Sequence, residues 1–164
     1  MDYLFLRRHK HTAVSERQKN LLFKAAERQW ELRFADKADE VREVDCILYK
    51  QILYHLEIKQ VFLDPALSLK GLCALIETNQ TYLSNMVNRC FGCNLKTLVN
   101  TYRVEYAKEL LRLGRCTVDE LPQRCGFASK SAFYAAFSKL AGVSPLRFKL
   151  YGQGAEHLEP AGYV

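Results

Sequence analysis

One spacing pattern occurs twice in the chain, and this repeat constrains the fold more than any other feature. Each copy has three apolar residues at helical spacing, then a further apolar pair and a glycine. In the first copy these residues are Leu69, Leu72, Ile76, Leu83, Val87 and Gly92. In the second copy, 49 or 50 residues later, they are Val118, Leu121, Cys125, Phe133, Phe137 and Gly142. A short helix, a tight turn and a second helix, present twice, predict a duplicated helix-turn-helix.

The rest of the chain is typical of an all-α fold. Prolines occur only at positions 65, 122, 145 and 160, and no β-branched alternation is sustained. We expect a long first helix over 15–62, ended by Asp64-Pro65, and then shorter helices that begin at Ser, Thr or Asn caps. Glycines end these helices, except the one over 68–76. The expected shorter helices span 68–76, 79–92, 94–114, 117–126 and 129–142, and a last one begins at Ser144-Pro145.

The helix between the two copies is expected to act as a strut. The 19 residues of 95–113 span roughly 28 Å at about 1.5 Å each, close to the 34 to 36 Å that separates successive major grooves on one face of DNA. The apolar stripe of this helix consists of Leu95, Leu98, Val99, Tyr102, Tyr106 and Leu110. Together with the repeat, this helix predicts two helix-turn-helix subdomains joined by a long helix. The tail 152–164 lacks periodicity and is expected to be disordered.

Charge favours a polyanionic partner without proving one. The chain has 24 Lys and Arg against 18 Asp and Glu, and residues 64–151 carry 12 basic and 6 acidic side chains. That segment therefore accounts for an excess equal to the net charge of +6. A merely solvated basic surface remains the alternative on charge alone.

The six cysteines do not predict a metal site. Cys90 and Cys93 form one C-x-x-C, but no second pair or nearby histidine completes four ligands, since the histidines are at 9, 11, 55 and 157. Cys73 and Cys125 fall in apolar helical patterns, where a free cysteine is a small hydrophobe. We expect no cofactor, no metal and reduced thiols. An enzyme is the least favoured class, because no cysteine or serine is accompanied by a histidine in a cleft-forming motif.

The second helix of the second copy has the properties of a recognition helix. Its inner face is expected to hold Ala132, Phe133, Ala136, Phe137 and Leu140. Its outer face holds Lys130, Ser131, Tyr134, Ala135 and Ser138, which are mostly small or polar. A helix in a major groove about 12 Å wide needs short outer side chains that let its backbone approach the bases. An ordinary amphipathic surface helix is the alternative.

The stretch "TVDELPQRCGFASKSAFYAAFSKLAGVSPLRF" resembles the signature of AraC/XylS-type transcription regulators. The matching residues are Gly126-Phe127, then Ser131 and Phe133, then Phe137, and finally Gly142 with Ser144-Pro145. The upstream stretch "FLDPALSLKGLCALIETNQTYLSNMVNRCFG" is similar to the first helix-turn-helix of Bacteroidetes-type members. The resemblance covers about 49–151 and implies a seven-helix C-terminal DNA-binding domain. On this basis we expect the domain at residues 46–151, preceded by a basic segment and helical linker at 1–45. It also implies a transcription regulator that inserts two recognition helices into successive major grooves.

The sequence departs from this family's pattern at two positions. Family members usually carry arginine at Ala135 and alanine at Pro122. Loss of the arginine removes a groove or phosphate contact. A proline inside a regular helix costs about 3 kcal/mol, so the helix containing Pro122 is expected to distort or to start late. These departures support the alternative function, a protein-interaction module that has kept the fold and lost DNA binding.

Within this resemblance we assign candidate DNA-binding residues to both subdomains. Those of the first are Asn79, Gln80, Thr81, Ser84, Asn85 and Asn88. Those of the second are Ser129, Lys130, Ser131, Tyr134, Lys139 and Arg147. Asn and Gln can bond bidentately to adenine, which favours Gln80 and Asn85 for base reading. Positive side chains that are candidates for phosphate contacts are Lys96, Arg103, Lys130, Lys139, Arg147 and Lys149. For any one of them, a solvated surface charge is the favoured alternative.

The first 45 residues lie outside the resemblance. "YLFL" followed by "RRHKH" is the pattern found just inside a membrane, but four apolar residues cannot cross about 30 Å of hydrocarbon. The chain is therefore expected in the cytoplasm, either free or as the cytoplasmic end of a membrane-tethered regulator. The expected partners are double-stranded DNA and RNA polymerase, together with a second copy or an upstream sensor held through residues 1–45.

Overall fold

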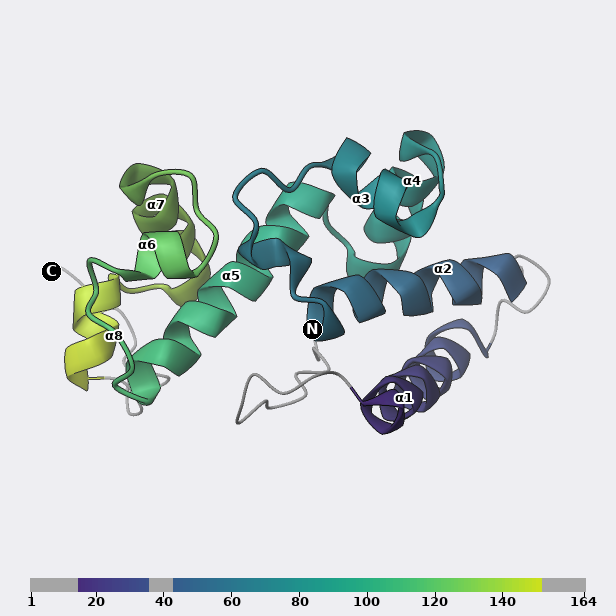
Figure 1. Cartoon of the computed structure of the whole chain (residues 1–164), viewed down its shortest axis with the longest axis horizontal. Helices are drawn as coiled ribbons and strands as arrows, with labels where there is room; N and C mark the ends of the chain where they lie inside the picture. The colour runs from purple at the N-terminus through teal and green to yellow at the C-terminus, as the bar shows by residue number, and fades with distance from the viewer. Residues whose placement is uncertain (1–14, 36–42, 152–164) are drawn as a thin grey trace, which may run out of the picture. The chain divides into compact units, whose positions relative to one another are not determined.

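The computed structural model describes residues 15–35 and 43–151, which contain eight α-helices and no strand (Figure 1). The described residues divide into two compact units. The first unit contains the residues up to Val61 and Leu67–Val99, and the second contains Phe62–Ala66 and the residues from Asn100 onwards. The all-α class expected from the sequence is confirmed.

The expectation of one long helix over 15–62 is wrong. The segment forms α1 (Glu16–Phe34) and α2 (Glu43–Leu53), then a π-helical turn (Tyr54–Ile58) and a 3-10 turn (Val61–Leu63). The physical reason is burial: Leu22, Ala26 and Trp30 form a stripe on α1 that a single straight helix would leave in water. Folding back brings α1 against α2, where the Trp30 and Tyr49 rings lie 5.4 Å apart between centroids.

The first unit continues with α3 (Leu69–Ile76) and α4 (Gln80–Phe91). The expected caps are confirmed: Ser68 Oγ accepts a hydrogen bond from the N–H of Gly71 (3.1 Å), and Asn79 Oδ1 accepts one from the N–H of Tyr82 (2.8 Å). Gly92 ends α4 in the left-handed conformation, with φ of 68°. Next comes α5 (Leu95–Arg112), whose first residues up to Val99 belong to this unit and whose remainder belongs to the second.

The second unit contains α6 (Leu121–Arg124), α7 (Lys130–Ala141) and α8 (Pro145–Tyr151). Ser129 and Gly142 bracket α7 as expected, with a side-chain cap at one end and a φ of 72° at the other. The hydrophobic core of this unit is formed by Val104, Ala107, Leu110, Leu111, Cys116, Leu121, Cys125, Phe127, Phe133 and Phe137. This core holds α7 against α5 and α6.

Pro122 is accommodated by a late helix start, which is one of the two outcomes that the sequence predicted. A helix was expected from Thr117, but α6 begins at Leu121, so Pro122 occupies the first turn. A residue there needs no N–H for helix bonding, and the usual penalty for proline in a helix interior is avoided. The Thr117 N–H donates a hydrogen bond to Glu120 Oε2 (2.8 Å), which is one of the two bonds of a capping box.

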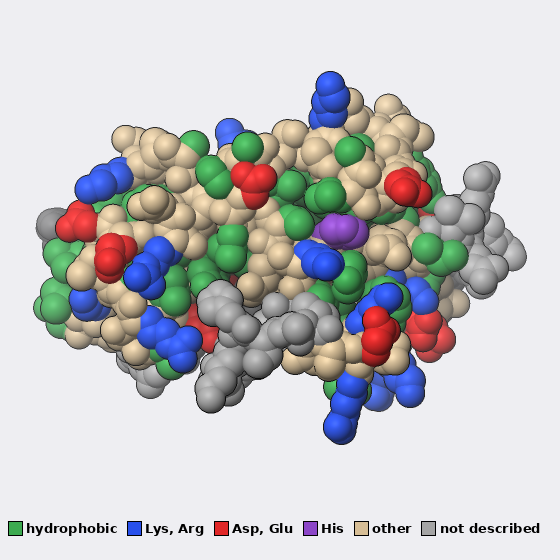
Figure 2. All heavy atoms as spheres, viewed as in Figure 1, with side chains coloured by type: hydrophobic (Ala, Val, Ile, Leu, Met, Phe, Trp, Pro, Cys, Tyr) green, Lys and Arg blue, Asp and Glu red, His purple; other side chains and the backbone are tan. Residues whose placement is uncertain are grey.

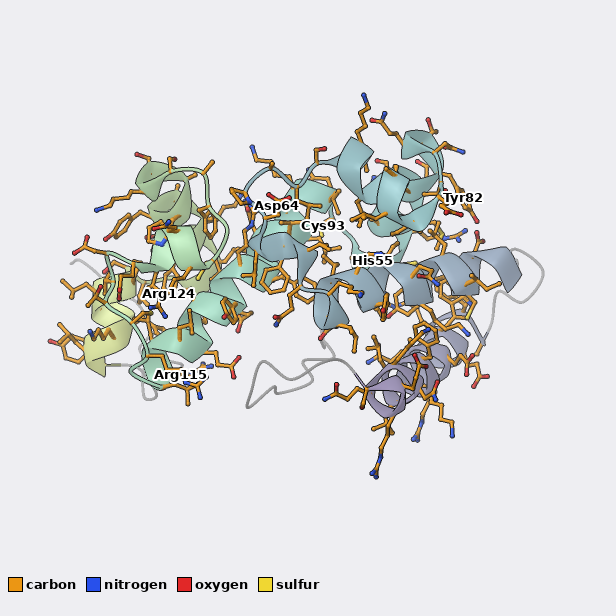
Figure 3. The ribbon with its side chains drawn as sticks, viewed as in Figure 1. His55, Asp64, Tyr82, Cys93, Arg115 and Arg124 are labelled. Carbon is orange, nitrogen blue, oxygen red and sulfur yellow. The ribbon has the colours of Figure 1, made fainter. Side chains whose placement is uncertain are left out.

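The segment Phe62–Ala66 is built into the second unit, although α3 and α4 of the first unit follow it in sequence. The Phe62 ring packs on Tyr102 with centroids 5.6 Å apart. Arg103 donates hydrogen bonds to the carbonyl oxygens of Phe62 (2.7 Å) and Asp64 (2.8 Å), and Figure 3 labels Asp64 in this loop. Arg103 is 9% exposed, so its expected role as a phosphate contact is wrong.

None of the helices in residues 15–35 and 43–151 is long and apolar enough to cross a membrane. The "YLFL" and "RRHKH" motifs and the tail 152–164 lie outside the described residues, so the expectations about them stay predictions.

Candidate nucleic-acid interface

In the first unit, α4 has one buried face and one polar outer face. Its buried residues are Leu83, Met86, Val87, Cys90 and Phe91, which include the apolar pair of the repeat, Leu83 and Val87. Gln80, Thr81, Asn85 and Asn88 are exposed, and Ser84 is half-buried. The structure thus brings five of the six candidates of this subdomain together along one helix. Their contact with DNA stays a prediction.

Asn79, the sixth candidate, has a structural task. Its side-chain oxygen caps α4 through the hydrogen bond from Tyr82. Ser129 does the same for α7, where its Oγ accepts a hydrogen bond from the N–H of Ala132 (3.2 Å). Such caps contribute about 1 kcal/mol to stability. Both side chains therefore already use an acceptor within the protein, which makes them weaker candidates for base reading than their exposed neighbours.

In the second unit, α7 exposes more of its surface than the sequence predicted. Phe133 and Phe137 are fully buried, at 0% exposure each, as expected. Ala132 and Leu140 were expected on the buried face but are exposed, and Ala136 is half-buried. The two aromatic rings, whose centroids lie 5.6 Å apart with tilted planes, anchor α7 to the core and leave the flanking positions uncovered. The expected five-residue inner face is therefore wrong for Ala132 and Leu140.

The remaining candidates of the second subdomain are all exposed. Lys130, Ser131, Tyr134 and Lys139 lie on α7, and Arg147 lies on α8. Lys130 lies 3.3 Å from Asp119, but both side chains are largely in water, at 67% and 81% exposure. A pair of this kind contributes little, so Lys130 can exchange Asp119 for another anion at small cost.

The sequence did not reveal a cluster of polar and charged side chains between α2 and α4, formed by Asp45, Tyr82 and Arg89. Asp45 on α2 is 4% exposed. It accepts a hydrogen bond from Tyr82 Oη and another from Arg89 Nη2 (2.7 Å), both on α4. The hydrogen bond to Asp45 raises the pKa of Arg89 above its ordinary value. No local sequence signal marks this cluster, because Asp45 lies 37 and 44 residues from its partners.

The cysteines behave as core residues. Cys73 and Cys125 are buried, which confirms their expected role. Burial raises the pKa of Cys90 to about 11 and that of Cys125 to about 12, so both thiols are neutral at physiological pH. In the described part of the chain, no three His, Cys, Asp or Glu side chains gather as metal ligands would.

The surface charge does not by itself mark a binding face. On the face shown in Figure 2, Lys and Arg side chains are interspersed with Asp and Glu side chains rather than gathered into one patch. The candidate interface is therefore defined by the outward rows of α4 and α7, and not by the charges on this face.

Comparison with known proteins shows which proteins this arrangement resembles. A family profile described as a helix-turn-helix domain matches residues 72–150. The melibiose operon regulatory protein of Escherichia coli (strain K12) is 24% identical over 90 residues, which are 55% of this chain and 30% of that protein. The chain thus matches about a third of the length of this curated relative.

Solved structures show the same fold. The C-terminal domain of AraT, a response regulator from Geobacillus stearothermophilus, is 26% identical with a TM-score of 0.58, covering 69% of this chain and 91% of that one. The DNA-binding domain of AdpA, a global transcriptional factor solved in complex with a target DNA, has a TM-score of 0.56 at 23% identity, covering 63% and 89%. Residues 72–150 of the chain are therefore similar to the AraC-type helix-turn-helix family in sequence and in fold.

Proposed function

We propose that the protein is a sequence-specific, DNA-binding transcription regulator that inserts α4 and α7 into successive major grooves. One observation carries the proposal: each compact unit presents a helix that is capped at its start, ended by a left-handed glycine and anchored by buried residues, with a polar or small outer face. A rigid helix with short outer side chains fits a major groove about 12 Å wide. The comparisons support the same function.

In this proposal the two helices contribute differently. α4 offers exposed amides at Gln80 and Asn85, which can donate to and accept from adenine at once. α7 offers small groups, among them Ser131 and Ala135, which let its backbone approach the groove closely. Lys130, Lys139 and Arg147 meet phosphates, which fix position and add affinity without sequence information. We therefore assign most of the base discrimination to α4.

The wider setting is part of the same proposal. The protein acts in the cytoplasm, where chromosomal DNA and RNA polymerase are available to it. A second copy, or a sensor upstream, engages it through residues 1–45, of which α1 is the described part.

The proposal is tested by selecting binding sequences for the whole chain from random double-stranded DNA. Affinities for the selected site and for random DNA are then measured for Asn85→Ala and Lys139→Ala. Asn85→Ala should weaken binding to the selected site by about 1 to 3 kcal/mol and relax preference at one base pair. Lys139→Ala should weaken both DNAs alike and reduce the salt dependence.

Matched controls lie on α1, where Asn20 and Lys24 are also exposed. Asn20→Ala and Lys24→Ala make the same chemical changes away from the proposed interface and should leave both affinities unchanged. Failure of the wild-type chain to enrich any sequence would contradict the proposal and favour the interaction module. Equal losses on both DNAs for Asn85→Ala would show that α4 does not read bases.

A further inference from the structure

The carboxylate of Asp45 is attached to α4 at two points. One oxygen accepts a hydrogen bond from Tyr82, in the first turn of α4, and the other accepts one from Arg89, in its last turns. Tyr82 is labelled in Figure 3. The Asp45 side chain is 5% exposed and that of Arg89 is 40% exposed, so the pair is shielded from water on the Asp45 side.

The two attachment points lie on one line along the helix. Tyr82 and Arg89 are seven residues apart, which is close to two full turns and about 10 Å along the axis. A single contact would let a helix pivot about it. Two contacts from the same carboxylate, at different heights on the same face, resist both rotation about the axis and sliding along it.

Further contacts hold the Arg89 end of this attachment. The guanidinium also reaches the sulfur of Met86 (2.9 Å) and lies 5.9 Å from the centre of the Phe34 ring on α1. Tyr49, on the same helix as Asp45, packs on Phe91 with ring centroids 5.7 Å apart. α2 therefore contacts both ends of α4, and Asp45 supplies the hydrogen bonds, which depend on direction.

Rotation matters because base reading depends on short distances. Side chains project about 5 to 6 Å from the axis of a helix, so a rotation of about 20° moves their ends by roughly 2 Å. Hydrogen bonds tolerate much less, since donor and acceptor must lie about 2.7 to 3.2 Å apart. A small loss of rotational control would thus remove the base contacts of Gln80 and Asn85 while leaving α4 folded.

We propose that Asp45 is a positioning residue for sequence recognition, which sets the rotation of α4 through Tyr82 and Arg89 and so aims Gln80 and Asn85 at the bases. The inference rests on the proposed function. It adds that specificity depends on a residue of α2 that does not itself face the proposed interface.

The test uses Asp45→Asn in the whole chain, with DNA selected by the wild-type protein. The amide keeps the shape and an acceptor for Tyr82 but removes the charge that holds Arg89. Binding to the selected site should weaken about tenfold, the discrimination of one well-placed base contact, while binding to random DNA changes less than about twofold. Arg89 is not replaced, because that would leave Asp45 buried without its cation.

The decisive readout is the cost of Asn85→Ala in each background. If Asp45 aims Asn85, the cost should be large in the wild type and small in Asp45→Asn, because the contact is already lost. A merely structural role would reduce specific and random binding together, in proportion to the folded fraction, and would leave the cost of Asn85→Ala unchanged. That result would overturn the inference.

Two further variants complete the test. Glu105→Gln makes a matching charge change at the Glu105–Lys108 pair on α5, to which no binding role is assigned, and should leave specificity intact. If circular dichroism shows that Asp45→Asn does not fold, Tyr82→Phe, which removes one hydroxyl, should weaken specific binding about threefold. Unchanged specificity in the folded variant refutes the inference alone. A wild-type chain that selects no sequence refutes the proposed function and the inference with it.

Discussion

Replacement of Gly126 by alanine should destabilise the second unit far more than the same change at other glycines. Gly126 has φ of 75°, and an added Cβ would lie 2.6 Å from the carbonyl oxygens of both Leu63 and Phe62. These are backbone atoms, and Phe62 is held in place by the hydrogen bond from Arg103. The overlap cannot be relieved by turning a side chain.

The expected magnitude has two parts. The left-handed conformation costs an alanine about 1 to 2 kcal/mol relative to glycine. The overlap with two carbonyl groups adds about 1 to 3 kcal/mol, as overpacking in a rigid core does. Gly126→Ala should therefore lower the free energy of unfolding by about 2 to 5 kcal/mol, a large part of the roughly 5 to 15 kcal/mol that stabilises a domain.

Gly142→Ala is the matched control, because Gly142 belongs to the same unit, has φ of 72°, and has no atom within 4 Å of an added Cβ. Gly142→Ala should lower the free energy of unfolding only by the cost of the left-handed conformation, about 1 to 2 kcal/mol. Urea unfolding followed by far-UV circular dichroism measures both variants. Trp30, the only tryptophan, lies in the first unit, so its fluorescence provides a separate reference for that unit. Equal losses in the two variants would refute the steric argument and show that the approach to Leu63 relaxes freely.

Two further predictions concern α6 in the second unit and the helix α5 between the two helix-turn-helix copies. Pro122→Ala should change the free energy of unfolding, measured by thermal unfolding, by less than about 1 kcal/mol, because Pro122 lies in the first turn of α6. An increase of about 3 kcal/mol in the free energy of unfolding would instead show that Pro122 is strained as a proline in a helix interior is. A monomer should protect one asymmetric site of roughly 17 to 20 base pairs in footprinting, and an insertion of five base pairs at its centre should abolish binding, because half a helical turn moves one groove to the far side. Tolerance of that insertion would indicate that one helix-turn-helix binds alone.

The sequence predicted the helix ends well because these are set by local chemistry. Ser68, Asn79 and Ser129 cap the helices that follow them, and each bonds a backbone N–H three residues on. Gly92 and Gly142 end helices in the left-handed conformation that other residues avoid. Both kinds of signal require no knowledge of distant residues. The repeat then indicated that the helices marked in this way form two helix-turn-helix subdomains.

The N-terminal helices could not be predicted in the same way. The periodicity of residues 15–62 fits one long helix as well as two packed ones, since each presents an apolar stripe. What decides between them is the pairing of Trp30 with Tyr49 and of Glu27 with Lys50, across 19 and 23 residues. Asp45 was missed for the same reason, because an aspartate in a helix looks like a solvated charge until its partners on α4 are known.

Arg103 shows why some side chains cannot be assigned from residue type at all. Its sequence position, on a helix in the basic half of the chain, favours a phosphate contact, yet its partners are the carbonyl oxygens of Phe62 and Asp64, 41 and 39 residues upstream. Every residue has a carbonyl, so the sequence carries no mark of such a partner. The carbonyls of Leu63 and Phe62 also exclude a side chain at Gly126, and Arg103 lies over the Phe127 ring (5.4 Å), which packs on Phe133 of α7 (5.3 Å). The "FLDP" segment, which the sequence marks as the end of a helix, thus contacts α7 through Arg103 and Phe127. A substitution of Arg103 should therefore alter the packing of α7, although this chain of residues links the two through Phe127 and not by direct contact.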